Sequence, residues 1–192
     1  MALLARGGAA PERVASHVLA AGPRGDPFAV EALRRAAQDA RDRGAADAAV
    51  HVLERALLEP PTPDVRAAIL VELGSAEALI AAPRAAERFE EALSLIDDPA
   101  EYAGVALALG RVLTRADRGP EALEWLDRGI ARLGDAEPEL ILRLEAEVIA
   151  AAHNNTSSYA LVPERMYPIT HALTGRTATT ECGQNVIHHR ST

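Results

Sequence analysis

The chain has 192 residues and a net charge of −8, with hydrophobic residues at 48% of its positions and aromatic residues at 3%. This length allows one domain or a short array of repeats. A composition rich in alanine and poor in aromatic residues is typical of closely packed helices rather than of a β-sandwich. The acidic balance argues against a nucleic-acid-binding surface, which would need a clustered basic face.

The start of the chain lacks the charged beginning and the long apolar core of a signal peptide, because Arg6 and Glu12 interrupt its apolar run. No apolar stretch reaches the roughly 18 residues that a membrane-spanning helix needs. We therefore expect a cytoplasmic protein that does not insert into a membrane. Cys182 is the only cysteine, so the sequence allows no intrachain disulfide and no CxxC metal site.

Proline and glycine residues divide the sequence that follows into segments of helix length. A helix is predicted to begin near Pro27, and later breaks are predicted at Gly44, Pro60-Pro61, Pro83, Pro99, Gly119-Pro120 and Gly134. The segments between these breaks carry apolar residues at spacings of three and four, as amphipathic helices do. Two predicted apolar stripes consist of Val65, Ile69, Leu70, Leu73 and Ala76, and of Leu107, Leu109, Val112 and Leu113. No segment alternates with a period of two, so no strand is predicted.

Small and large residues recur in these segments with a period near 36. The small residues Ala49, Ala85 and Ala122 lie 36 and 37 residues apart. Each is followed by a large apolar residue and then by a small one, and another small residue lies about a dozen positions before it. The large residues are Leu53, Phe89 and Leu126, and the small residues that follow them are Ala56, Ala92 and Gly129. The small residues about a dozen positions earlier are Ala37, Gly74 and Gly110. Small residues let helices approach closely, and the large ones are predicted to fill the space between one helix pair and the next.

This spacing resembles the tetratricopeptide repeat, which has a small residue in its first helix and a small, large, small pattern in its second. Pro61 matches the proline that follows the second helix of that repeat. The repeats here are slightly longer than the usual length of about 34 residues, and aliphatic residues occupy most of the aromatic positions. The predicted fold class is all-α: a tetratricopeptide-like α-solenoid of stacked antiparallel helix pairs.

The composition changes near Ala152, which predicts two regions. Residues 1–152 form the tetratricopeptide-like helical repeat region, and residues 153–192 form an irregular or weakly helical C-terminal tail. The first region carries 26 acidic residues and 17 arginines, whereas the tail carries two and three. The spacing of the candidate ligands in the tail matches no standard zinc site, so neither a metal nor a cofactor is predicted. These candidates are His171, Cys182, His188 and His189.

Residues 8–80, which begin GAAPERVASHVLAAG, and residues 88–113, RFEEALSLIDDPAEYAGVALALGRVL, resemble the helical middle of LuxR-type, MalT-like ATP-dependent transcriptional regulators. Members of that family combine an ATPase module, helical repeats and a C-terminal helix-turn-helix. The chain has no lysine for the phosphate-binding loop GxxxxGK[ST], and no segment after Ala152 reads as a basic helix-turn-helix. The resemblance therefore implies that ATP and DNA are bound only by modules absent from this chain. A fragment, a split gene or an isolated domain would account for that absence.

In the tetratricopeptide register, residues beside the small position of each first helix are predicted to face the concave side. They include Val71, Ser75 and Leu107, and the candidate partner-binding residues Arg34, Gln38, Arg41, Arg111 and Arg115. The four arginines could form bidentate contacts to carboxylates or phosphates. Alternatively, they pair with acidic residues on adjacent helices or are only solvated.

The sequence predicts a non-catalytic sensor or coupling segment of a LuxR-type regulator that binds a protein, a peptide or a small effector. The alternative is a free-standing tetratricopeptide-like adaptor for a protein or peptide. An enzyme is the least favoured hypothesis, because no nucleophile–base pair or metal constellation is present and no catalytic residue is predicted. Trp125 is predicted to pack between repeats, and the alternative is that it marks an exposed partner site. Because little sequence is available to cap the array, we expect self-association or marginal stability.

Overall fold

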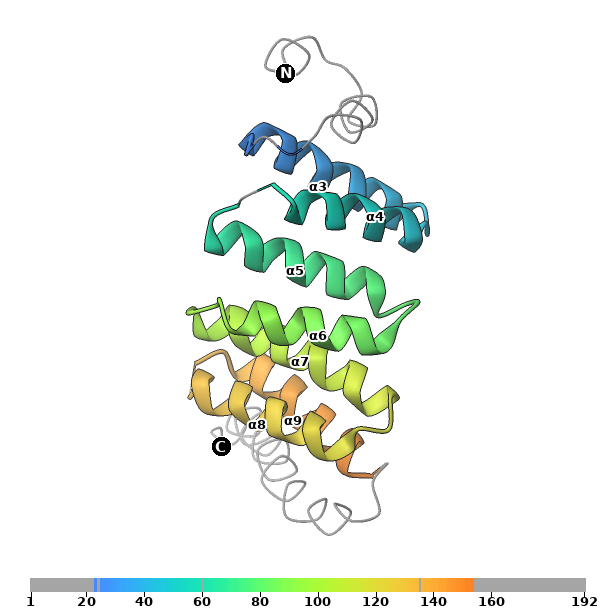
Figure 1. The fold of residues 1–192 in the computed structure, drawn as a ribbon. Coiled ribbons are helices and arrows are strands. Elements are labelled where there is room, and N and C mark those ends of the chain that lie inside the picture. The colour runs from blue at the N-terminus through green and yellow to red at the C-terminus, as the bar shows by residue number, and fades with distance from the viewer. Residues whose placement is uncertain (1–22, 24, 60, 135, 154–192) are drawn as a thin grey trace, which may run out of the picture.

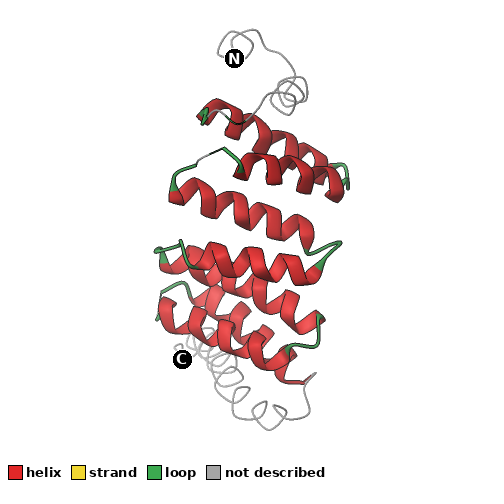
Figure 2. Ribbon diagram, in the orientation of Figure 1, coloured by secondary structure: helices red, strands yellow, loops and turns green. Residues whose placement is uncertain are grey.

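The computed structural model describes residues 23, 25–59, 61–134 and 136–153, and these residues form seven helices and no strand. The helices are α3 (Pro27–Asp42), α4 (Ala46–Leu57), α5 (Pro63–Glu77), α6 (Ala82–Leu93), α7 (Pro99–Arg115), α8 (Gly119–Leu133) and α9 (Pro138–His153). They stack in one array, in which successive helices run in opposite directions (Figures 1 and 2). The prediction of an all-α solenoid is confirmed.

The described residues end with α9, so most of the predicted tail lies outside them. The same holds for the candidate ligands His171, Cys182, His188 and His189. The proposed boundary between a repeat region and a tail at residues 152 and 153 therefore stays a prediction.

Prolines mark where the first helix of each pair begins. These helices, α3, α5, α7 and α9, begin at Pro27, Pro63, Pro99 and Pro138. Proline suits this position because the N–H that it lacks would have no partner within the helix. Asp26 and Asp98 also act as N-caps, and their carboxylates accept hydrogen bonds of 3.0 and 2.8 Å from the N–H groups of Phe28 and Glu101. Local chemistry thus sets the helix starts that the repeat requires.

A small residue of the first helix lies against the large residue of the second helix in the same pair. A Cβ atom added to Gly74 on α5 would lie 3.0 Å from the ring of Phe89 on α6. A Cβ atom added to Gly110 on α7 would lie 2.7 Å from Leu126 on α8. Phe89 and Leu126 are both buried. Within each pair, the large residue thus fits against the small one, and both large residues belong to a cluster that extends from α5 to α9.

The apolar core continues along the array because a middle helix buries more than one side. On α5, Ile69, Leu73 and Ala76 belong to a buried cluster with α3 and α4. Ala67 and Leu70 belong to a second cluster with α6, α7, α8 and α9. The single apolar stripe predicted for α5 is therefore divided between two neighbouring helix pairs. The stripe predicted for α7 is buried throughout.

Two glycines of α7 provide a matched test of the close contact. Gly104 is exposed, and a Cβ atom there would meet nothing within 4 Å. Gly104→Ala should therefore raise the free energy of unfolding by about 0.5–1 kcal/mol, because alanine favours the helix more than glycine does. Gly110→Ala should lower it, since overpacking costs about 1–3 kcal/mol. Denaturant unfolding of both variants measures the difference, and equal stabilisation would contradict the close contact at Gly110.

Candidate partner-binding face

Side chains of the described first helices meet at two places in the array. Arg34 on α3 forms an ion pair with Glu72 on α5, and Arg111 on α7 forms one with Glu147 on α9. These helices run in the same direction (Figure 1). We use the name first-helix face for the predicted residues Arg34, Gln38, Arg41, Arg111 and Arg115 together with the two paired acids, Glu72 and Glu147.

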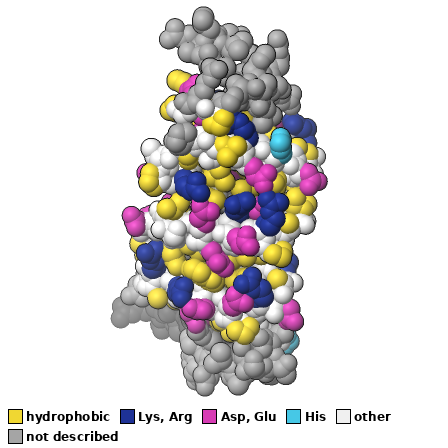
Figure 3. Space-filling model, viewed as in Figure 1, with side chains coloured by type: hydrophobic (Ala, Val, Ile, Leu, Met, Phe, Trp, Pro, Cys, Tyr) yellow, Lys and Arg dark blue, Asp and Glu magenta, His cyan; other side chains and the backbone are white. Residues whose placement is uncertain are grey.

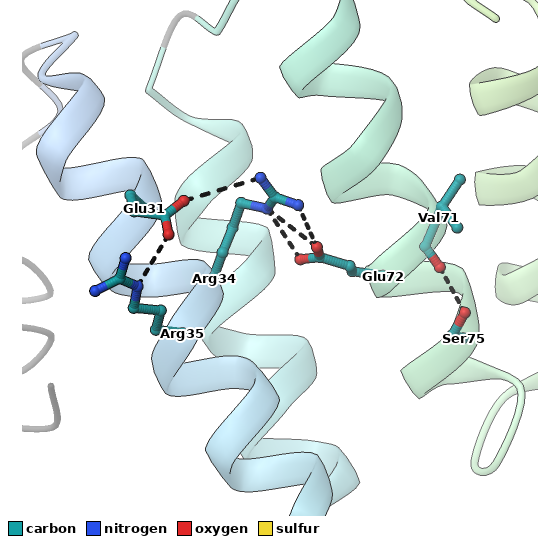
Figure 4. A network of polar contacts seen from close by, with 6 residues as sticks. All are labelled: Glu31, Arg34, Arg35, Val71, Glu72 and Ser75. Carbon is teal, nitrogen blue, oxygen red and sulfur yellow. Dashed lines mark hydrogen bonds and ion pairs between the residues drawn. The ribbon is translucent and has the colours of Figure 1, made fainter. Parts of the chain in front are cut away.

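Arg34 and Glu72 form a bidentate contact between two helix pairs (Figure 4). Nε of Arg34 donates to both carboxylate oxygens of Glu72, at 3.1 and 3.2 Å. Nη1 of Arg34 also lies 4.0 Å from the carboxylate of Glu31 on its own helix. The hydrogen bond with Glu72 raises the pKa of Arg34 above its ordinary value, so the guanidinium stays charged. Because the two side chains are only 30% and 27% exposed, this pair is screened less than a surface pair.

The other candidates differ in what they contact. Nε of Arg111 lies 3.2 Å from the carboxylate of Glu147, and the amide of Gln38 donates to Asp42 one turn later on α3 at 2.8 Å. Arg41 and Arg115 lie in the last turns of α3 and α7, where a cation is favoured by the helix dipole. Neither forms an ion pair with another residue that the structure describes. Pairing with acids on adjacent helices, the alternative considered from the sequence, thus holds for Arg34 and Arg111.

The uncharged residues predicted for this face differ in burial. Val71 and Ser75 are half-buried, and the Ser75 hydroxyl donates to the Val71 carbonyl at 2.7 Å (Figure 4). Leu107 is buried in the core. A partner therefore cannot reach Leu107, because α7 packs against α6, α8 and α9.

A buried carboxylate that the sequence pattern does not mark lies where α5 ends. The side chain of Glu77 is 0% exposed, with Oε1 3.0 Å from Nη2 of Arg84 and Oε2 3.5 Å from Nε of Arg88. Neither contact has the geometry of a hydrogen bond. Arg84 also pairs with Glu54 on α4. An acid near a helix end with arginines close by in the sequence reads as a surface cluster, so no signal marked Glu77 as buried.

Among the described residues, no group of three or more His, Cys, Asp or Glu side chains could hold a metal ion. Likewise, none of the helices in the described ranges is long and apolar enough to cross a membrane.

Neither a protein-family model nor a curated protein matches the chain. Several solved structures share its fold, among them the following two. The crystal structure of MamA has a TM-score of 0.65 and 22% sequence identity, and covers 88% of this chain and 88% of its own. That of a Podosopora anserina putative kinesin light chain with nearly identical TPR-like repeats has a TM-score of 0.68 and 18% identity, and covers 85% of each chain. The chain has a tetratricopeptide-like repeat fold. At these identities the likeness shows the fold alone, and nothing in it ties the chain to LuxR-type regulators.

The buried carboxylate makes stability depend on pH. Burial raises the pKa of Glu77 above its ordinary value, and the charges of Arg84 and Arg88 offset part of this rise. The folded state therefore binds the proton more tightly than the unfolded state, whose glutamate pKa is about 4.3. The contribution of Glu77 to the free energy of unfolding is largest when the pH is below the unfolded-state pKa. It is lost as the pH rises through the pKa in the folded state.

Glu77→Gln should reduce the fall in the free energy of unfolding as the pH rises. It should not lower stability at pH 7, because Arg84 keeps Glu54 as a partner and Arg88 remains partly solvated. Denaturant unfolding between pH 4 and pH 8 measures both effects. The control, Glu87→Gln on the exposed side of α6, should change stability by less than about 0.5 kcal/mol throughout. A Glu77→Gln curve parallel to that of the unmodified chain would contradict the raised pKa.

Proposed function

We propose that the chain is a non-catalytic protein-interaction adaptor that binds a protein or peptide partner on its first-helix face. The observation that carries this proposal is the arrangement of that face. Its helices run in one direction. The Arg34–Glu72 pair joins α3 to α5 and the Arg111–Glu147 pair joins α7 to α9, whereas Arg41 and Arg115 have no ion pair with a described residue. A partner with carboxylates at matching positions would gain two cationic contacts without breaking an ion pair between helices.

The tetratricopeptide-like fold supports a binding role rather than a chemical one. Its apolar side chains fill the contacts within and between helix pairs, and the polar side chains of the first-helix face pair across neighbouring helices. Such an array offers a long, preformed surface on which a partner can bind with little ordering of the array itself.

Charge reversal at Arg41 and Arg115 tests the adaptor. A partner isolated from cell extract on the unmodified chain, and then purified, should bind the Arg41→Glu/Arg115→Glu variant at least about tenfold more weakly in calorimetry, because two attractive contacts become repulsive. The control is Arg143→Glu on α9, where Arg143 is exposed and pairs with Glu139. Equal affinity of the unmodified chain and the double variant would contradict binding on this face.

The finer hypothesis is that the adaptor serves a LuxR-type regulator, as the resemblance of residues 8–80 and 88–113 implies. We propose that partner binding would then influence an ATPase module and a DNA-binding module encoded elsewhere. A neighbouring reading frame for either module would favour this hypothesis over a free-standing adaptor.

If ATP is bound only by a module encoded elsewhere, the purified chain alone should neither bind nor hydrolyse ATP. The chain has no lysine to contact the phosphates. Isothermal calorimetry with Mg-ATP and a phosphate-release assay measure these two properties. Saturable micromolar binding of ATP that persists in the Arg34→Ala variant would contradict the hypothesis that ATP is bound only by a separate ATPase module.

A further inference from the structure

A groove of about 550 Å³ lies on another part of the array, where α6 and α8 meet the start of α7. The view in Figure 3 has basic and acidic side chains interspersed, with no large patch of one sign. The groove is different in composition. Leu93, Tyr102 and Trp125 supply apolar and aromatic surface, Arg128 and Arg132 supply two cations, and Glu90 supplies one carboxylate. Its lining is thus apolar with an excess of positive charge, in a chain whose net charge is −8.

Aromatic rings hold both arginines in place. The guanidinium carbon of Arg132 lies 4.1 Å from the ring centre of Tyr102, and that of Arg128 lies 4.7 Å from the ring centre of Trp125. Nη1 of Arg132 also donates to the carbonyl of Ile96 at 3.1 Å. A guanidinium stacked on a ring keeps N–H groups along its edge for a further ligand. These contacts therefore order the two cations without neutralising them.

Among the described residues, few carboxylates compete for these cations. Arg128 pairs with Glu124 one turn earlier on α8, and both side chains are exposed. Such a pair is weak and exchanges readily for a better-placed partner. Arg132 has no carboxylate partner among the described residues. Arg128 and Arg132 are four residues apart on one helix, so their side chains project from the same face and one ligand can reach both.

We propose that this groove binds a peptide segment that carries acidic side chains beside an apolar residue. A carboxylate of the segment bridges Arg128 and Arg132, and the apolar residue packs on Trp125 and Leu93. Tryptophan and arginine together are the residue types that dominate binding energy at protein interfaces. The site adds a second surface to the proposed adaptor function and uses no residue of the first-helix face.

Trp125 is the only tryptophan of the chain, so its fluorescence reports directly on the groove. The probes are three peptides of equal length with Gly-Ser flanks and Glu-Leu-Glu, Gln-Leu-Gln or Lys-Leu-Lys cores. The acidic peptide should change the fluorescence saturably, with half-saturation below about 1 mM, and the other two should not. Equal binding of the Gln peptide, preference for the Lys peptide, or no saturable change with the acidic peptide would each overturn the proposal.

Arg128→Gln and Arg132→Gln should each weaken binding of the acidic peptide about tenfold or more, measured by calorimetry. Arg143→Gln is the matched control, because Arg143 and Glu139 form the same kind of exposed pair on α9, outside the groove. Arg132 also contacts Tyr102 and Ile96, so circular dichroism must show that its variant is folded. If that variant does not fold, the exposed Arg128 still decides the outcome, and unchanged affinity of Arg128→Gln contradicts the bridging contact. A negative result leaves the partner test of the first-helix face unaffected, so the two proposals fail separately.

Discussion

The rest of the structure depends on the close approach of the two helices within each pair. Gly74 and Gly110 provide the room for Phe89 and Leu126, and even a methyl group at Gly110 would lie closer to Leu126 than ordinary van der Waals contact allows. The chain has few aromatic residues, so most of its core consists of alanine and aliphatic side chains. Dispersion attraction among such short side chains falls off quickly with distance, which makes the small positions necessary. Because each pair packs on the previous one, a separation of helices in one pair would displace every pair that follows.

Much of this fold could be predicted from the sequence, because the features that set it are local or repeated. Proline at Pro27 and Pro99 removes an N–H that a helix start does not need. Gly44 has a φ of +74°, a left-handed conformation that glycine adopts without strain, so the break after α3 could be read from one residue. The period near 36 was visible because the same contact between small and large residues recurs in successive pairs. None of these inferences requires knowledge of how far each helix is rotated about its axis.

Helix rotation and side-chain pairing could not be read in the same way. Ile69 and Leu70 are adjacent and both buried, yet they belong to different clusters, so an apolar stripe does not reveal that α5 has two packed sides. The repeat register predicts Leu107 on a binding face, whereas the packing of α7 against α6, α8 and α9 buries its side chain. The partner of Arg34 is 38 residues away in the sequence. A search for acids about one repeat after each arginine would have found Glu72 and Glu147, but only the structure shows that they reach their partners.

The number of arginines on a face is therefore a poor guide to its capacity to bind an acidic partner, because carboxylates of the same chain compete for them. Arg34 is engaged by a bidentate, half-buried carboxylate, and a partner that took this contact would leave Glu72 without its cation. Arg132 is held by an aromatic ring and a backbone carbonyl, so an incoming carboxylate displaces no anion from it. On the first-helix face, Arg111 pairs with Glu147, whereas Arg41 and Arg115 have no ion pair with a described residue. Arginines that are ordered by uncharged neighbours combine a fixed geometry with an unsatisfied charge, which a carboxylate ligand needs for tight and selective contact.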